Sequence, residues 1–74
     1  MTKKEELENP NSCINKTADN ESIFVLRSQD LLAPTLVRLW ADRAASAGCP
    51  TDKVEEARRL ADAMDQWPNR RYPN

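Results

Sequence analysis

The stretch Ile23–Leu26 most constrains the fold, because it is the only run of four consecutive large apolar residues in the chain. Isoleucine, phenylalanine and valine favour extended backbone, and the run is too short to form a helix by itself. Side chains alternate across a strand, so both faces of this segment are apolar. We therefore expect a short strand that ends in the polar residues 27–30.

This strand needs a partner, because no other segment of the chain has the pattern of a strand. A lone strand leaves its backbone donors and acceptors unpaired. Pairing with the same strand of a second subunit in an antiparallel ribbon would satisfy them. The length of 74 residues points the same way, since so small a domain rarely builds a sufficient core alone. We expect a homodimer or a higher oligomer with the strand paired between subunits.

The first 22 residues differ in composition from the rest. Leu7 and Ile14 are their only large aliphatic residues, and three lysines stand against five acidic residues. Such a segment cannot bury enough apolar surface to offset the entropy of ordering it. We expect a disordered tail over 1–22 and a single small oligomerising domain over 23–74.

Two helices are expected after the strand, at about 34–47 and 52–67. Pro34 suits a first helical turn, Gly48 suits a helix end, and Pro68 stops the second helix. The second helix begins with a capping-box pattern at Asp52, with Thr51 as an alternative cap. The helices would face each other through residues spaced for one side of a helix, with Trp40 and Trp67 supplying much of the buried area. In the first helix these are Leu36, Val37, Trp40, Ala44 and Ala47, and in the second Val54, Ala57, Leu60, Ala61, Met64 and Trp67. The fold class is therefore mainly α, a β-α-α chain with a short strand before a helical hairpin.

Composition argues against catalysis, metals and membranes. The chain has no histidine, which is the usual general base, and one glycine cannot form a phosphate-binding loop. Cys13 and Cys49 alone do not make a zinc cluster. Without a secretory signal or an apolar run of about 20 residues, the thiols should be reduced in a cytoplasmic protein. We expect no enzyme activity, no cofactor, no metal and no membrane partner.

Arginines beside aromatic residues are the candidate ligand-binding groups. Guanidinium forks bind phosphate or carboxylate, and aromatic faces stack on bases or rings. The candidates are Arg27, Arg43, Trp67, Arg70, Arg71 and Tyr72. Two alternatives stand beside this interpretation: the C-terminal group is a solvated terminus, or Arg27 forms a structural pair with Asp30 or with an acid of a partner subunit.

Two resemblances carry further expectations. The strand ending in Arg27 and the Gly-x-x-Thr turn at 48–51 resemble the ribbon-helix-helix DNA-binding family over about 23–67. That resemblance implies a dimer whose strands read DNA in the major groove. In this chain the residues that alternate with Phe24 and Leu26 are Ile23, Val25 and Arg27, of which only Arg27 could contact a base or phosphate.

The second resemblance is to a group of short, uncharacterised phage and prophage proteins, over about 22–74. It rests on Ile-Phe-Val-Leu-Arg-Ser-Gln-Asp-x-Leu-Ala-Pro at 23–34, Val-Arg-x-Trp-Ala-x-Arg-Ala at 37–44 and Trp-Pro-x-Arg at 67–70. It implies an accessory, anti-defence role in the host cell cytoplasm. The leading hypothesis is sequestration of a small anionic, nucleotide-type signal at a subunit interface. The alternatives are a ribbon-helix-helix-like DNA-binding regulator and a protein-binding inhibitor of a host factor.

Overall fold

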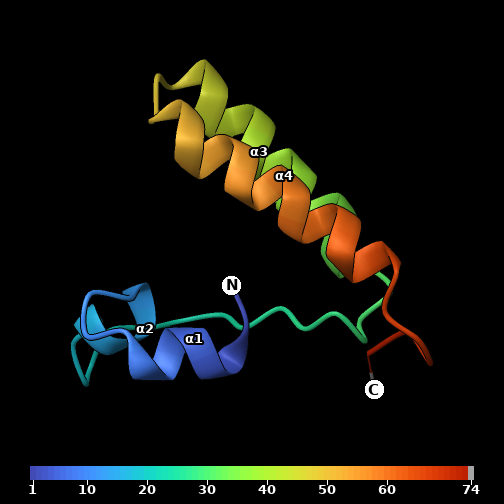
Figure 1. Ribbon diagram of the computed structural model, residues 1–74, viewed down its shortest axis with the longest axis horizontal. Coiled ribbons are helices and arrows are strands. Elements are labelled where there is room, and N and C mark those ends of the chain that lie inside the picture. The colour runs from blue at the N-terminus through green and yellow to red at the C-terminus, as the bar shows by residue number, and fades with distance from the viewer. Residues whose placement is uncertain (74) are drawn as a thin grey trace.

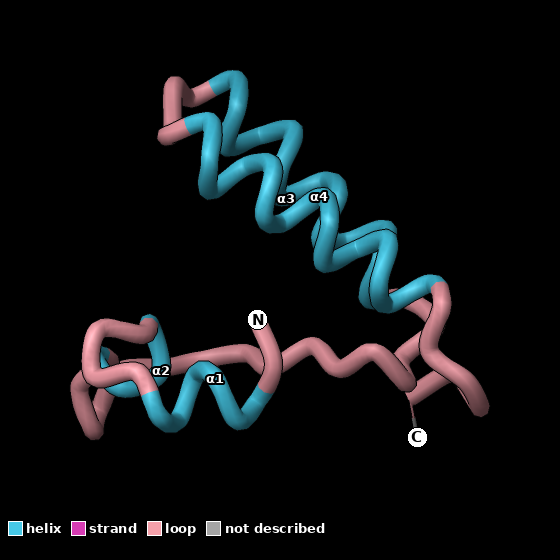
Figure 2. Tube along the Cα trace, viewed as in Figure 1, coloured by secondary structure: helices cyan, strands magenta, loops and turns pink. Residues whose placement is uncertain are grey.

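A computed structural model describes residues 1–73 as a mainly helical chain. Its helices are α1 (Lys3–Glu8), α2 (Cys13–Lys16), α3 (Ala33–Ser46) and α4 (Thr51–Asp65). In Figure 1, α3 and α4 form an antiparallel hairpin, and α1 and α2 form a small separate unit. Figure 2 shows the long non-helical segment that joins the two units. The expected helical hairpin is confirmed, with each helix end within two residues of its predicted position.

The turn between α3 and α4 follows from Gly48. Its φ of +81° is a left-handed conformation that favours glycine, and the Cys49 amide then donates to the Ala44 carbonyl at 3.0 Å. The expected capping box at Asp52 is wrong, because Pro50 is the N-cap residue and no side chain caps this helix end. Helix α4 begins instead with the Pro50 carbonyl accepting from backbone amides of the first turn.

Small residues fill the seam of the hairpin. The buried residues of the two helices are Ala33, Pro34, Ala41 and Ala44 in α3, and Val54, Ala57, Ala61 and Met64 in α4. Alanines in both helices let the two backbones approach closely, so the large side chains of α3 cannot enter the seam. The prediction that Trp40 and Trp67 are core residues is wrong: both side chains are 55% exposed, and Leu36 is also exposed.

Ion pairs cover one flank of the hairpin, where they link the two helices. Arg38 bonds to Asp62 at 2.8 Å and also to Asp65, and Arg58 bonds to Asp42 at 3.2 Å. These pairs cross from one helix to the other. We call this side of the hairpin the charged flank.

The expected strand is extended but unpaired within the described chain. No backbone hydrogen bond involves residues 22–26 anywhere in 1–73, and Phe24 is 84% exposed. Pairing of this segment between subunits stays a prediction. One short contact has formed at its C-terminal end, where Asp30 and Arg71 make an isolated parallel bridge.

Residues 1–22 form two short helices where the sequence predicts a disordered tail. Polar groups rather than apolar burial hold this unit together, since neither helix buries a residue. Thr2 and Glu5 form a capping box at the start of α1. The Asn15 side-chain amide donates to the carbonyls of Glu6, Leu7 and Asn9 at 3.0, 3.0 and 2.9 Å. The expectation of a disordered tail rested on the scarcity of apolar residues, and it did not take these local polar hydrogen bonds into account.

Within residues 1–73, no helix has the length and apolar character needed to cross a bilayer. Cys13 and Cys49 are free and exposed.

Candidate functional site

The C-terminal segment returns to the start of the hairpin and lies beside residues 27–31. Pro68 follows helix α4, and Asn69 takes a positive φ of 58° that turns the chain back. The Arg71 amide then donates to the Gln29 carbonyl at 2.8 Å, and the Leu31 amide donates to the Arg71 carbonyl at 2.9 Å. This bridge brings together two segments that the sequence leaves far apart.

Arg70 holds these two segments in place. Its Nε donates to the Ser28 carbonyl at 3.2 Å, and its Nη2 donates to the carbonyls of Asp30 and Leu31, both at 3.4 Å. Its Nη1 lies 3.6 Å from Asp65 Oδ1, and the side chain is only 16% exposed. Arg70 was a candidate ligand-binding residue, but its donors are used inside the chain, so it positions the site.

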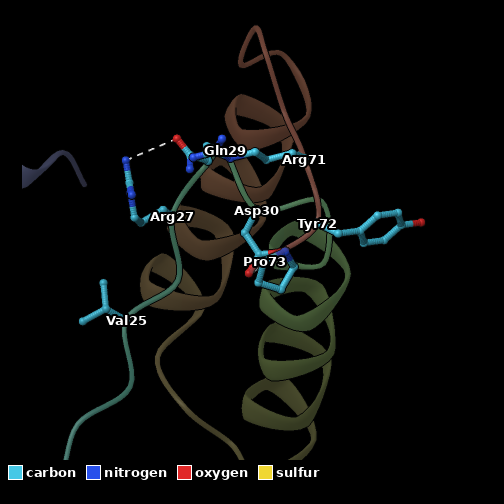
Figure 3. Close-up of a pocket in the computed structure, with 7 residues that line it drawn as sticks. All are labelled: Val25, Arg27, Gln29, Asp30, Arg71, Tyr72 and Pro73. Atoms are coloured by element: carbon cyan, nitrogen blue, oxygen red, sulfur yellow. Dashed lines mark hydrogen bonds between the residues drawn. The ribbon is translucent and has the colours of Figure 1, made fainter.

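Arg27 and Arg71 approach one amide from two sides. Figure 3 shows Arg27 on the extended segment and Arg71 on the C-terminal segment, both directed toward Gln29. Arg27 Nη2 lies 3.4 Å from the Gln29 side-chain oxygen. With the Gln29 amide rotated by half a turn, its oxygen instead accepts from Arg71 Nε at 3.2 Å and Nη2 at 3.1 Å. A neutral amide therefore sits between two cationic groups and can bond to either.

An open pocket of about 290 Å³ lies at this point. Its lining residues come from both segments: Val25, Arg27, Gln29, Asp30, Arg71, Tyr72 and Pro73. Neither Arg27 nor Arg71 forms an ion pair within the described chain. The Asp30 carboxylate also lines the pocket, and its Oδ1 accepts from the Leu32 amide at 2.8 Å. Among residues 1–73, the pocket therefore presents two cations without an ion-pair partner against one carboxylate whose Oδ1 is already bonded.

The other candidate residues are placed differently. Tyr72 lines the pocket, but its ring points away from Arg27 in Figure 3, and the residue is 67% exposed. Trp67 and Arg43 do not line the pocket. Arg43 lies about 15 Å along α3 from its first residue, by the helical rise of 1.5 Å per residue. The structure thus brings together Arg27, Arg71 and Tyr72 at the pocket, and Arg43 and Trp67 are not among its lining residues.

Gln29 and Asp30 are site residues that the sequence did not indicate as ligand-binding. Both are common polar residues after a strand-like segment, and their role depends on a bridge to residue 71. The described residues contain no group of three side chains able to hold a metal ion. What this arrangement offers chemically is hydrogen bonding and charge for an anionic group.

No model of a known protein family, no curated protein and no solved structure matches this chain.

Proposed function

We propose that the protein binds and sequesters a small anionic, nucleotide-type ligand in the pocket between Arg27 and Arg71. The observation that supports this is the approach of two unpaired guanidinium groups to one pocket from separate segments. A guanidinium presents several donors in a planar fork that matches the oxygens of a phosphate. Two such forks suit a group that carries two negative charges.

The remaining polar groups suit the rest of a nucleotide. Asp30 uses Oδ1 for the Leu32 amide, and its Oδ2 accepts no bond from residues 1–73. That oxygen can accept from a hydroxyl or an amino group of the ligand. The Gln29 amide offers both a donor and an acceptor. A volume of about 290 Å³ is at the lower end for small-molecule sites, so part of the ligand would remain in solvent.

The proposed activity is binding without chemistry. The chain has no histidine, and the pocket's one carboxylate, Asp30, has Oδ1 bonded to the Leu32 amide. The resemblance to short phage proteins supports an anti-defence setting, in which capture of a signal would itself be the function. Val25 lies at the pocket's rim, and all the lining residues come from one chain, so the pocket does not depend on pairing of the extended segment between subunits.

A capture-and-release assay tests this proposal. The purified protein is incubated with a panel of nucleotide signals, the free ligand is measured, and the protein is then heated to release what it holds. We expect depletion and recovery of at least one panel member. Arg27→Ala and Arg71→Ala should each abolish depletion. Arg59→Ala is the matched control, because Arg59 is an exposed arginine of α4 that does not line this pocket.

Two outcomes would count against the proposal. Wild-type protein that neither depletes nor returns any panel member removes its support. Binding of duplex DNA that falls steeply with salt, and that is lost in Arg27→Ala, would favour the ribbon-helix-helix alternative. A pull-down from host lysate addresses the third hypothesis, a protein-binding inhibitor.

A further inference from the structure

The hairpin has a second flank, on which large apolar side chains gather near the open end of the hairpin, while Arg43 and Glu56 lie nearer the turn. At about 100° per residue, Leu36 and Trp40 lie on one side of the buried positions of α3, and Arg38 lies on the other. In α4, Leu60 lies on one side of the buried positions and Asp62 on the other. Since Arg38 bonds to Asp62, the charged sides of the two helices coincide. The apolar sides of the two helices must therefore coincide on the opposite flank.

Large side chains remain exposed on this flank and on the adjoining outer face of α3, which together we call the apolar flank. Leu32, Leu36 and Leu39 are 46%, 44% and 49% exposed, and Trp40 and Trp67 are each 55% exposed. Leu32, Leu36 and Leu39 are spaced four and then three residues apart, which is the spacing of a helix–helix contact stripe. By contrast, the seam that holds α3 against α4 is made mostly of alanine. The larger apolar surface of the hairpin thus faces outward.

We infer that this apolar flank is where a second copy of the chain docks, so that two hairpins form a four-helix bundle. This inference is independent of the ligand pocket. In a two-fold dimer the same patch meets itself, so an apolar patch is complementary to its own copy. Four-helix bundles bury such stripes between antiparallel helices.

Full burial of these five side chains would bring the interface to the smallest area found in stable dimers. A half-exposed tryptophan leaves on the order of 100 Å² to bury, and a half-exposed leucine leaves about 50 Å². Two copies would then bury roughly 700 Å² of apolar surface, which corresponds to about 1,200 Å² in total at the usual apolar share of an interface. That total reaches the lower limit of stable, specific interfaces.

The N-terminal unit is a weaker occupant for this flank. Met1 and Thr2 reach its edge, where they line a groove of about 270 Å³ with Glu56, Arg59, Leu60 and Ala63. Beyond those two residues, the unit offers only Leu7 and Ile14 as large aliphatic residues, and it is otherwise polar. Leu7 and Ile14 are too few to cover the five large side chains of the apolar flank. The apolar flank of a second hairpin has the same area as the flank that it would cover.

The mass of the full chain in solution tests the inference. Light scattering or sedimentation at high micromolar concentration should give twice the 8.4 kDa of one chain. Leu36→Lys places a charge on the apolar flank and should yield a monomer. Phe24→Lys places the same charge in the extended segment, away from the hairpin, and should leave the dimer intact. Circular dichroism of each variant reports whether its helices persist.

Tryptophan emission gives a second readout that needs no variant. Trp40 and Trp67 would lose solvent on dimerisation, so dilution of the wild type should shift emission to the red as the mass halves. A wild-type monomer at high micromolar concentration overturns the inference. So does a Leu36→Lys dimer, and so does a Phe24→Lys monomer, which would place the interface at the extended segment instead.

Discussion

Arg70 Nε donates to the carbonyl oxygen of Ser28 at 3.2 Å, across 42 positions of the chain. The same guanidinium reaches the carbonyls of Asp30 and Leu31 and lies near Asp65 at the end of α4. One side chain thereby joins the entry and the exit of the hairpin. The pocket between Arg27 and Arg71 exists because this closure holds its two sides together.

Arg70→Ala should therefore destroy the pocket without removing any of its lining residues. Loss of charge-assisted hydrogen bonds at this partly buried site should cost about 1–3 kcal/mol of unfolding free energy, mostly in the local opening of the C-terminal segment. The amide protons of Leu31 and Arg71 should exchange with solvent faster, as measured by NMR. Ligand capture should fall together with that protection.

Arg70→Lys separates charge from geometry. Lysine keeps the positive charge near Asp65 but cannot reach three carbonyls with a planar fork. We expect it to behave like Arg70→Ala in amide exchange. Full protection in Arg70→Lys would show that charge alone closes the hairpin.

Gly48 gives a prediction about the turn. A β-carbon at this position would meet no atom within 4 Å, so the cost of substitution is conformational only. At φ +81°, alanine should lose about 1–2 kcal/mol relative to glycine. Asparagine tolerates this region better, so Gly48→Asn should lose less. Urea unfolding of the two variants measures the difference, and equal stability of Gly48→Ala and wild type would contradict the assignment.

The ends of α3 and α4 were predictable from the sequence because local residues set them. Pro34, Gly48 and Pro68 each restrict the backbone at or beside their own position, and no distant contact is needed. The buried face was not predictable in the same way. A prediction based on the size of apolar side chains places Leu36 and Trp40 between the helices. In the structure the two helices pack so closely that the residues buried between them are mostly alanine.

The site was partly predictable for a similar reason. Residue type alone marked Arg27, Arg71 and Tyr72 as candidates, and the pocket includes all three. Their proximity depends on the bridge between Asp30 and Arg71, which no local pattern indicates. Arg70 was misjudged for the same reason. An arginine beside aromatic residues suggests a ligand-binding role, but Arg70 lies beside the carbonyls of three distant residues and bonds to them.

The charged flank should contribute little stability, and that little should depend on salt. Arg38 is paired with Asp62 and Asp65, and these hydrogen bonds raise the pKa of its guanidinium. The groups are exposed, so solvent screens them. Arg38→Ala should lower the melting temperature slightly at low ionic strength. Near 1 M salt, where the screening length is about 3 Å, the difference from wild type should vanish. A difference that grows with salt would contradict this.

The start of α1 should respond to pH on both sides of neutrality. The α-amino group of Met1 bonds to Glu5 at 2.8 Å, which raises the amino pKa above 8.0 and lowers the Glu5 pKa below 4.5. The amino group's contribution is therefore full below pH 8.0 and is lost as pH rises through its raised pKa. The carboxylate's contribution is full above pH 4.5 and is lost as pH falls through its lowered pKa. Helical chemical shifts over Lys3–Glu8 should be constant between these limits and decline outside them.

Glu5→Gln is the control for that titration. Glutamine keeps the hydrogen-bonding geometry of the capping box but removes the charge. The decline at low pH should disappear in this variant, and the decline at high pH should weaken. An unchanged profile would show that other groups control the helix.

Overpacking the alanine seam should be the most damaging change to the hairpin. Ala41 and Ala61 are fully buried where α3 meets α4, so a larger side chain there must push the helices apart. Ala41→Leu should lose about 1–3 kcal/mol of unfolding free energy although leucine is more hydrophobic than alanine. Ala45→Leu adds the same atoms on an exposed position of the same helix, and it should be nearly neutral. Denaturant unfolding compares the two. If Ala41→Leu were as stable as Ala45→Leu, the helices would not be in the close contact that keeps Leu36 and Trp40 out of the seam.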